Sequence, residues 1–553
     1  MSVYVLDIET TMDQKTIHCV VVRNISTGGV STFFNSFEFR NWLGYHPISI
    51  IFIGHNIIDF DKRVLEDVWG VMFTKTYFID TLVLSRLLFP ERQSHSLKAW
   101  GDELGCPKIE FDKFDEYSPE MLQYCIQDTY VTQAVHTHLT NTTYDSRAVK
   151  LEHDVQHILT SMQAKGFKLD RQKVIDLKCD MEAELYTIEE GLKEVFPDEV
   201  IYVTMKTKVK TVITPFNPGS RQQVAKRLME MGWKPTKLTP TGQPMVDEDT
   251  LKDVDIPEAK IIRRYFLLQK RVSQLDQWLE YVDDNDRVHC KIIGNGAVTG
   301  RATHSKPNLG QVVGVQSEYG KEFRECWTVD KGKLLVGVDL EGIEARIMAH
   351  YMQDDAYIQS VIAGDKKLGT DFHSVNMRAF GLTSRDTAKT AFYALIYGAG
   401  SAKMAAILGC SVREAKKRIN DFYDNTPALK ALKLKIERVA KQGWLPGLDG
   451  RRIPVRSAHS AMNTLFQSGG AVVSKQWMIN TQEGIDKAKL YTTMDAKIVM
   501  WVHDELQNEV DEEHAQLMAS ICVKAAQETQ HQLNLRVPVA AVAKIGLNWY
   551  ETH

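Results

Sequence analysis

Short apolar runs and helical patterns follow one another through residues 1–145. Runs of strand length stand at Val3–Leu6, His18–Arg23, Val30–Phe34 and Ile48–Ile53. Turn residues at Thr27–Gly29 separate the second run from the third. Apolar residues at helical spacing follow at Asp80–Leu88, at Leu97–Leu104 and from Pro119 to Leu139. The pattern therefore predicts an α/β domain over residues 1–145.

Helical periodicity dominates the next part of the chain. It is long and regular from 150 to 195 and returns at 221–232 and 258–282, whereas residues 196–220 look irregular and basic. From Cys290 onward the pattern is mixed. It predicts a strand at Leu334–Leu340, helices at Ile343–Met352 and 385–398, and strands on both sides of His503–Asp504. We therefore expect boundaries near residues 145 and 290.

Composition narrows the class of protein. The chain has 553 residues, 44% hydrophobic and 25% charged, which is ordinary for a soluble protein of several domains. Its longest apolar stretches are far shorter than the ~18 residues that a membrane span needs. Asp7 and Glu9 interrupt what would be the apolar part of a signal peptide. Eight scattered cysteines without a CxxC pair indicate a reducing compartment, so we expect a cytoplasmic protein without membrane contact.

The net charge of −4 argues mildly against a nucleic-acid-binding protein. Nucleic acid responds to the local field, however, and catalytic carboxylates can offset a basic groove in the total. Local basic runs do occur, and each is equally well explained as a solvated helix face. They comprise Lys206, Lys208, Lys210, Lys260, Arg263, Arg264, Lys270 and Arg271.

Two aspartates stand at the ends of apolar strands in the C-terminal half. Asp339 closes the run LLVGVDL, and Asp504 lies in VMWVHDELQN, which is typical of a hairpin with acids at its turn. Carboxylates on neighbouring strands can hold two Mg²⁺ ions ~3.5–4 Å apart, the arrangement used in phosphoryl transfer. Either aspartate alone would be an ordinary surface turn residue, so the interpretation depends on the segment between them.

That segment, RDTAKTAFYALIYG, places four residues at intervals of four. On a helix they form one stripe of two cations followed by two aromatic rings: Arg385, Lys389, Tyr393 and Tyr397. Cations near a helix N-terminus oppose the helix dipole unless an anion is bound. A triphosphate on the cations, with its base toward Tyr393, would supply that anion. The alternative is an amphipathic helix with a charged end.

The segments VGVDLEGIEAR, RDTAKTAFYALIYG and VHDE, in this order, resemble motifs A, B and C of the family A DNA polymerases, especially those of short-tailed lytic bacteriophages. GAVTGRATHSKPNLGQV, GLDGRRIPVRSAH and NTLFQS also match, so the resemblance covers nearly the whole chain. It implies a multidomain α/β architecture. An exonuclease domain at 1–145 would be followed by a right-hand polymerase, with a helical thumb and the start of the palm at 146–290, and palm and fingers at 291–553 (fingers about 355–445).

The resemblance also implies roles for matching residues. Asp339 and Asp504 would bind two catalytic Mg²⁺ ions, assisted by the carbonyl of Leu340, with Mn²⁺ as the alternative ion. Nucleotide binding would fall to His373, Arg385, Lys389 and Tyr393, while Glu344 would exclude ribonucleotides. The residues implied to contact DNA are Arg301, Tyr397, Asn463, Gln467 and His503. Donors in the minor groove would test pair shape without reading sequence.

A second set of carboxylates lies in the N-terminal domain. Asp7 and Glu9 are two apart on a strand and share one face, an arrangement of like charges that a bound metal makes tolerable. Asp61 follows the apolar strand at the start of a helix, and Tyr124 and Asp128 share one face of another helix. Together they resemble the DEDDy 3′→5′ exonucleases with a ribonuclease-H-like fold. The resemblance implies that the four acids bind two Mg²⁺ ions and that Tyr124 orients the attacking water.

The expected activity is primer extension on a DNA template with proofreading, and the expected role is replication of a phage genome. Its substrates would be primer-template DNA and deoxynucleoside triphosphates (dNTPs), and its partners helicase-primase and single-stranded DNA-binding protein. Thioredoxin is not expected, because residues 196–215 are too few for an extra subdomain. Three alternatives remain at this point: a single-subunit RNA polymerase, a non-catalytic DNA clamp, and a repair enzyme.

Overall fold

The computed structural model describes residues 2–46, 49–204 and 209–553. The chain forms two compact units, one of residues 1–166, 290–311 and 329–553, the other of residues 167–289 and 312–328. The three expected domains do not coincide with these units. The helix α6 (Ser146–Lys165), expected in the region of the thumb and the start of the palm, belongs to the first unit together with the N-terminal domain.

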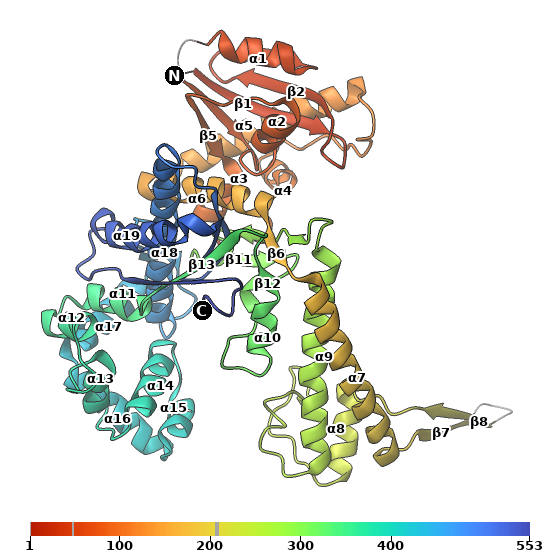
Figure 1. The fold of residues 1–553 in the computed structure, drawn as a ribbon, viewed down its shortest axis with the longest axis vertical. Helices are drawn as coiled ribbons and strands as arrows, with labels where there is room; N and C mark the ends of the chain where they lie inside the picture. Colours follow the sequence, from red (N-terminus) through yellow and green to blue (C-terminus); the bar gives the residue numbers. More distant parts are fainter. Residues whose placement is uncertain (1, 47–48, 205–208) are drawn as a thin grey trace. The chain divides into compact units, whose positions relative to one another are not determined.

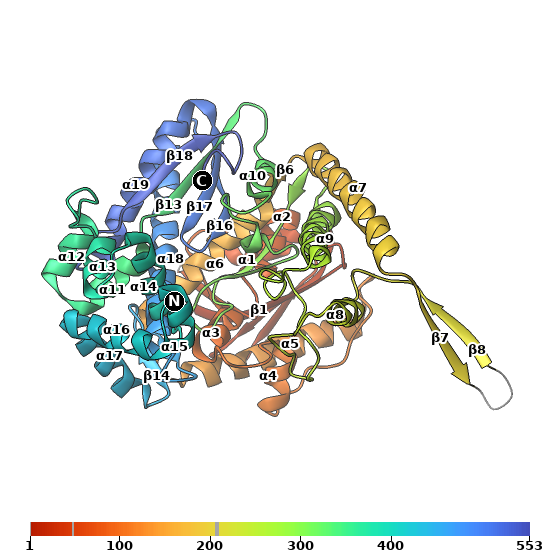
Figure 2. The same cartoon turned by 90° about the horizontal axis from the view of Figure 1, so that it is seen from below.

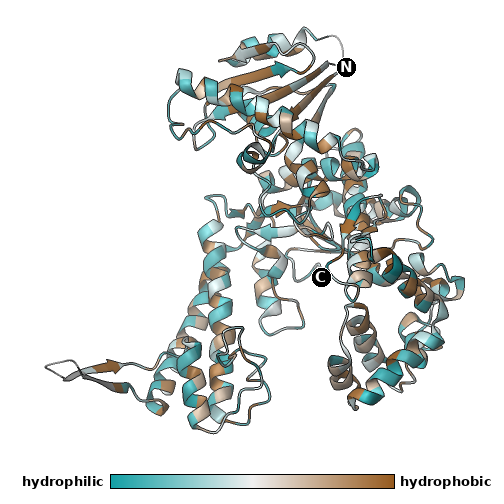
Figure 3. Ribbon diagram, turned by 180° about the vertical axis from the view of Figure 1, so that it is seen from behind, coloured by the Kyte–Doolittle hydropathy of each residue, from teal (hydrophilic) through white to brown (hydrophobic). Residues whose placement is uncertain are grey.

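The N-terminal domain is built on a five-stranded sheet in the order β3-β2-β1-β4-β5 (Figure 1). The pairs β1–β2 and β2–β3 are antiparallel, whereas β1–β4 and β4–β5 are parallel. The strands are largely hydrophobic (Figure 3). Their bounds are β1 Ser2–Thr10, β2 Ile17–Asn24, β3 Val30–Phe33, β4 Ile50–Gly54 and β5 Thr76–Asp80.

Helices cover both faces of this sheet, so it forms the middle of three layers. The side chains of Leu6 and Ile8 pack against α1 and α2 through a core that contains Phe39 and Leu65. The opposite face packs against α5 through Cys125. The helices are α1 Ser36–Gly44, α2 Asp61–Trp69, α3 Thr81–Leu88, α4 Leu97–Glu103 and α5 Pro119–Thr140. Because side chains alternate along β1, Asp7 and Glu9 lie on the α5 face.

A four-stranded antiparallel sheet in the order β16-β17-β13-β18 forms the centre of the C-terminal part. The helices α18 and α19 pack against each other beside it, and α11 packs on α18. The bounds are β13 Lys333–Leu340, α11 Ile343–Met352, α18 Ala461–Lys489, β16 Ala496–Val502, β17 Glu505–Asp511, α19 Ala515–Gln532 and β18 Ala541–Gly546. Small strands and turns of this unit are β10 Lys291–Ile293, β11 Thr303–Ser305, β14 Trp444–Pro446, β15 Arg452–Pro454, η1 Leu309–Gln311 and η2 Glu512–His514.

A helical subdomain lies between α11 and β14 (Figure 1). It contains α12 Asp355–Ile362, α13 Phe372–Ala379, α14 Arg385–Ile396, α15 Ser401–Leu408, α16 Val412–Asn425 and α17 Pro427–Ala440. Its core joins α13, α14 and α16, because Phe380 stacks on Phe422 at 4.0 Å between ring centroids and Phe392 lies beside both helices. This packing fixes the helix that carries the predicted stripe.

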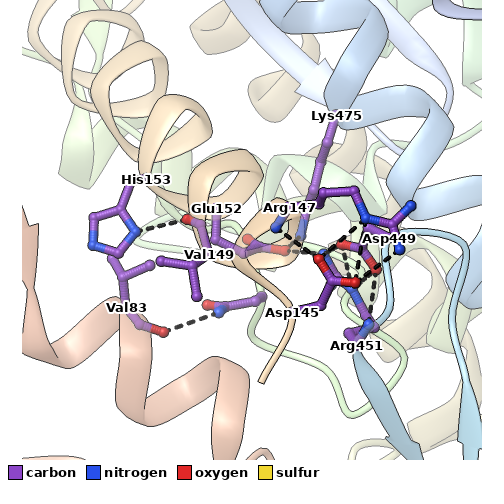
Figure 4. Close-up of polar contacts among 10 residues, drawn as sticks. Val83, Asp145, Arg147, Val149, Glu152, His153, Asp449, Arg451 and Lys475 are labelled. Carbon is purple, nitrogen blue, oxygen red and sulfur yellow. Dashed lines mark hydrogen bonds and ion pairs between the residues drawn. The ribbon is translucent and has the colours of Figure 1, made fainter. Parts of the chain in front are cut away.

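A buried cluster of charges ties α6 to the C-terminal part of the same unit (Figure 4). Glu152 Oε1 accepts hydrogen bonds from Arg451 Nη2 at 2.7 Å and from Lys475 Nζ at 2.5 Å. Arg451 also pairs with Asp449 at 2.6 Å. Burial lowers the pKa of Lys475 to about 8, although Glu152 opposes the shift. The next residue, His153, accepts the backbone N–H of Asp80 at 2.9 Å, so α6 contacts both the N-terminal sheet and the charge cluster.

The second unit is mainly helical. The long helices α7 and α9 pack together with α8, and the core between them includes Leu192, Phe216 and Phe266. A hairpin of β7 and β8 extends away from these helices (Figures 1 and 2). The bounds are β6 Phe167–Leu169, α7 Arg171–Val195, β7 Glu199–Thr204, β8 Val209–Thr214, α8 Arg221–Glu230, α9 Pro257–Tyr281, β9 Arg287–Val288, α10 Gly320–Glu325 and β12 Trp327–Thr328.

Most predicted elements are confirmed to within a few residues, with two corrections. The long helical pattern of 150–195 is interrupted at Gly166, whose φ of +67° ends α6 before β6 begins. Residues 196–215, predicted irregular, contain the strands β7 and β8. Ile48, the first residue of the predicted strand Ile48–Ile53, and Lys206 and Lys208 of the basic run lie outside the described residues. Within the described part of the chain, no helix is long and apolar enough to cross a bilayer.

Candidate active sites

The two predicted palm aspartates lie beside each other at one end of the central sheet. Asp339 stands near the end of β13 directly opposite Glu505 on β17, and Asp504 occupies the turn between β16 and β17. The N–H of Leu340 donates to the backbone oxygen of Asp504 at 3.0 Å, which fixes the two strand ends together. Burial raises the pKa of Asp504, so a nearby cation would stabilise its charged form. The hairpin with acids at its turn is therefore confirmed.

Glu505 is held by more partners than the sequence suggested. Its Oε1 accepts hydrogen bonds from Gln507 at 2.6 Å and from the Trp549 indole N–H. Its other oxygen lies 3.3 Å from Nδ1 of His553, which is 3.8 Å from a carboxylate oxygen of Asp339. Ligand atoms of Asp339, Glu505 and His553 lie within 4.8 Å of one another, a spacing that can hold a metal ion.

A cavity of about 270 Å³ opens beside Asp504. Five of the predicted residues line it: Arg301, Glu344, Tyr397, His503 and Asp504. Glu344, in the first turn of α11, accepts a hydrogen bond from Arg301 at 3.0 Å and another from the Tyr397 hydroxyl. The carboxylate of Glu344 thus joins α11 to the end of α14. The left-handed backbone of His503, with φ of +56°, forms the turn that precedes Asp504.

The stripe predicted on α14 is present, with Ser384 as its N-cap. Tyr393 and Tyr397 stack with ring centroids 6.4 Å apart, and His373 on α13 lies 5.9 Å from Tyr393. Lys389 is exposed. Arg385 pairs with Asp371 at 2.7 Å, a contact that the sequence pattern did not indicate.

This ion pair fixes α13 to the start of α14. Asp371 is the N-cap of α13, and Arg385 together with the hydrogen bond from Ser374 lowers its pKa to about 2. The pKa of His373 falls to about 4, first through burial and then through the charges of Arg385 and Lys389. A neutral imidazole can accept or donate a hydrogen bond to a phosphate without changing charge.

Asn463 and Gln467 lie one helical turn apart on α18 and are half-buried. Neither residue lines the cavity beside Asp504. The amide oxygen Oδ1 of Asn463 is buried, and among the described residues no group donates a hydrogen bond to it. An unpaired polar atom of this kind is consistent with a missing ligand, and the contacts implied for both residues with DNA stay predictions.

The second set of acids converges on the α5 face of the N-terminal sheet. Asp7 and Glu9 project from β1, and the Cys125 thiol on α5 donates to Asp7 Oδ2 at 3.3 Å. Asp128 lies one turn further along α5 and is buried. Burial and the charge of Asp128 raise the pKa of Asp7 to about 7, and burial with the charges of Asp7 and Asp128 raises that of Glu9 to about 10.

Asp61 completes this group from the other side. It is the first residue of α2, and its Oδ1 accepts the backbone N–H of Ile8, between the two acids of β1, at 3.1 Å. Burial and then the charge of Asp7 raise its pKa. Buried carboxylates that raise one another's pKa are held together at an electrostatic cost, which a divalent cation would relieve. The four predicted acids are thus in one cluster.

Two further residues belong to this cluster. Lys108, in the loop before α5, pairs with Asp128 and lies 4.7 Å from the centre of the Tyr124 ring. Cys125 shares a metal-sized group with Asp7 and Glu9, within 4.8 Å. The sequence offered a signal for Cys125, because it lies three residues before Asp128 on one helix face. Lys108 stands in an irregular segment, where no periodicity indicates its direction.

Residues 192–551, well over half of the chain, match DNA polymerase family A. The chain belongs to DNA polymerase family A. Its function is that of a DNA-directed DNA polymerase, and polymerases of this family use divalent metal ions. This membership favours DNA synthesis over the RNA polymerase and the non-catalytic clamp.

Two phage polymerases are similar over most of their length. The DNA-directed DNA polymerase of Enterobacteria phage T3 is 30% identical, over 86% of this chain and 88% of the relative. That of Escherichia phage T7 is 29% identical over 97% of both chains. Among solved structures, the POL domain of Pol1 from M. smegmatis, in complex with DNA primer-template and dNTP, covers 99% of this chain and 96% of its own, with a TM-score of 0.80. At 20% identity this last likeness concerns the fold.

We expect Glu344→Ala to increase incorporation of ribonucleotides relative to deoxynucleotides by about tenfold or more. The substitution removes bulk and charge from the cavity beside Asp504, so a 2′-hydroxyl would no longer be rejected there. Competing dNTP and rNTP extension measures the ratio. Glu341→Ala, an exposed acid just before α11, is the matched control. An unchanged ratio would exclude a steric role for Glu344.

Proposed function

We propose that this polymerase combines template-directed DNA synthesis with 3′→5′ exonuclease proofreading in its N-terminal domain. The observation that carries the proposal is the convergence of Asp7, Glu9, Asp61 and Asp128 on the α5 face, with Tyr124 one turn from Asp128. The strand order, antiparallel on one side of β1 and parallel on the other, supports a ribonuclease-H-like fold. Four acids on separate elements are the pattern of a two-metal hydrolase.

The residues of this site fit divalent metal ions. Asp128 Oδ1 is buried and, among the described residues, receives no hydrogen bond, so it can serve as a ligand. Oxygen donors with few protein ligands suit Mg²⁺, and Mn²⁺ is the alternative ion. Bound ions would supply Lewis-acid stabilisation of the phosphodiester and of an attacking hydroxide. Tyr124 would then orient that water, while Asp7, Glu9, Asp61 and Asp128 hold the ions.

In the palm, Asp339 and Asp504 would hold the metal ions together with the carbonyl of Leu340. Their position at one sheet end, where Asp504 lines a cavity, supports this assignment. Lys389, Arg385 and His373 would bind the triphosphate, and Tyr393 the sugar and base. Because Arg385 already pairs with Asp371, a triphosphate on α14 would compete with or join that pair. Tyr397 would contact the template base, and Arg301, Asn463, Gln467 and His503 the primer-template minor groove.

A single gel tests both activities. A 5′-labelled primer annealed to a longer template is incubated with Mg²⁺, first without and then with all four dNTPs. We expect progressive shortening from the 3′ end in the first reaction and full extension in the second. A primer that stays intact without dNTPs, on single-stranded substrate as well, would contradict the exonuclease while leaving the polymerase in place.

The role in replication of a phage genome is supported by the relatives from phages T3 and T7, which match over nearly their whole length. Primer-template DNA and dNTPs are the corresponding substrates. Helicase-primase and single-stranded DNA-binding protein stay predictions, and so do the cytoplasmic location and the independence of thioredoxin. A role in repair is the alternative that the sequence left open.

We expect Tyr393→Phe to lower incorporation of dideoxynucleotides about 10²-fold relative to dNTPs. The Tyr393 hydroxyl can replace the missing 3′-hydroxyl of the terminator as a hydrogen-bonding group, whereas phenylalanine cannot. Its ring lies between those of His373 and Tyr397, two other predicted site residues, which supports this role. Termination frequency is measured at a fixed ddNTP:dNTP ratio in an Asp7→Ala/Glu9→Ala background. Equal termination by both proteins would show that Tyr393 does not face the sugar.

A further inference from the structure

A lysine lies within the exonuclease-like carboxylate cluster. Lys108 is four-fifths buried, and its ammonium group pairs with Oδ2 of Asp128. The same group lies over the Tyr124 ring, 4.7 Å from its centre. Lysine side chains seldom bury their ammonium group, because removing the charge from water costs free energy. A lysine at this position therefore needs partners that stabilise the buried charge. Asp128 and Tyr124 are those partners.

The two carboxylate oxygens of Asp128 have different surroundings. Oδ2 is engaged by Lys108, whereas Oδ1 is buried and receives no hydrogen bond from any described residue. With one oxygen fixed, the carboxylate cannot rotate freely, so Oδ1 keeps its direction. Lys108 at the same time restrains Tyr124, because its ammonium group lies over the Tyr124 ring while it pairs with Asp128. One side chain thus sets the geometry of two predicted site residues.

We propose that Lys108 is a positioning residue of the exonuclease site, which orients the Asp128 carboxylate toward the metal ions and the Tyr124 hydroxyl toward the attacking water. The inference rests on the proposed exonuclease function and adds a residue that the four-acid pattern does not contain. The position of Lys108 also has a consequence for metal binding. The positive charge that improves the geometry also repels divalent cations, because like charges a few ångströms apart interact strongly in a buried site.

Loss of the lysine should therefore change rate and metal affinity in opposite directions. In Lys108→Met the stem still packs over the Tyr124 ring, but the charge and the donors are gone. We expect the maximal exonuclease rate to fall about 30-fold, within the range for loss of an outer-shell partner. We expect the Kd for Mn²⁺ to fall about tenfold, because the repulsion is removed. Damage to the fold would instead lower both the rate and the affinity.

The experiment uses the full-length chain. Exonuclease rates are measured under single-turnover conditions on a 5′-labelled single-stranded oligonucleotide over a series of Mg²⁺ concentrations. Mn²⁺ binding is followed by electron paramagnetic resonance of the free ion, without DNA, in an Asp339→Ala/Asp504→Ala background that removes the palm ligands. Lys98→Met is the matched control, because Lys98 is an exposed lysine of the same domain that pairs with Glu110. Lys108→Arg keeps the charge and should retain most of the rate.

The outcomes separate the two proposals. A slower Lys108→Met with tighter Mn²⁺ binding, near-normal Lys108→Arg and normal primer extension supports the positioning role. An unchanged rate, or a rate and an affinity that fall together, overturns that role while leaving the exonuclease intact. A wild-type protein that digests no substrate overturns the exonuclease and the role of Lys108 with it.

Discussion

Replacing Asp504 by alanine is expected to lower the rate of primer extension at least ~10³-fold, since a lost metal ligand removes several kcal/mol of stabilisation from the transition state. Asp504 lies in the turn of the β16–β17 hairpin, where its backbone oxygen binds Leu340 and its side chain lines the cavity beside Glu344. Single-nucleotide incorporation by rapid quench measures the effect. Digestion of single strands should persist, because the other site lies in a different domain of the chain.

The structure offers an alternative to Asp504 as a metal ligand. Glu505 and His553, rather than Asp504, form the metal-sized group with Asp339. If Asp504→Ala extended primers within tenfold of wild type while Glu505→Ala did not, the metal ligands would be Asp339 and Glu505. Glu513→Ala, an exposed acid that follows the same hairpin, is the matched control and should extend normally.

The double substitution Asp7→Ala/Glu9→Ala is expected to have the converse effect. Exonuclease activity should fall at least ~10³-fold, because two ligands of the proposed metal site are lost, while primer extension stays within a factor of about two. Without metal the two acids repel each other and Asp128 in a buried site, as their raised pKa values indicate. The variant should therefore be at least as stable as wild type when chelator is present.

Digestion of a labelled single strand measures the first effect, and thermal unfolding in chelator measures the second. Asp13→Ala, an exposed acid in the turn after β1, serves as control for both. Residual digestion near the wild-type rate would mean that the nuclease activity resides elsewhere. A marked loss of stability in chelator would instead show that these acids have structural partners beyond the cluster.

The site elements could be predicted because their signals are local. Asp7 and Glu9 share a face through strand alternation, and Arg385 to Tyr397 share one through helical spacing, so no tertiary knowledge was needed. The predicted hairpin around Asp504 followed from two apolar strands separated by polar residues. These patterns follow from the regular repeat of side-chain directions along a strand or a helix, and this repeat is the same in every fold.

The features that the sequence pattern did not predict depend on tertiary contacts or on the conformation of a single residue. Arg385 pairs with Asp371, fourteen residues away, and Lys108 with Asp128, twenty residues away, through contacts that no periodicity encodes. Among the described residues, the strands β7 and β8 pair only with each other, as a two-stranded sheet. Apolar and polar residues do not alternate regularly in this segment, so the sequence pattern predicted no strand there. The break at Gly166 depended on one left-handed residue within a long helical pattern.

The charge cluster around Glu152 decides where this protein can be shortened. A polymerase fragment without the N-terminal domain could be cut at the end of α6, but that cut would remove the carboxylate shared by Arg451 and Lys475. Two interior cations would then have Asp449 as their remaining acid, and removing one partner of a buried pair costs ~3–5 kcal/mol. A fragment that begins before Ser146 keeps the helix and its glutamate. The minimal polymerase therefore includes α6.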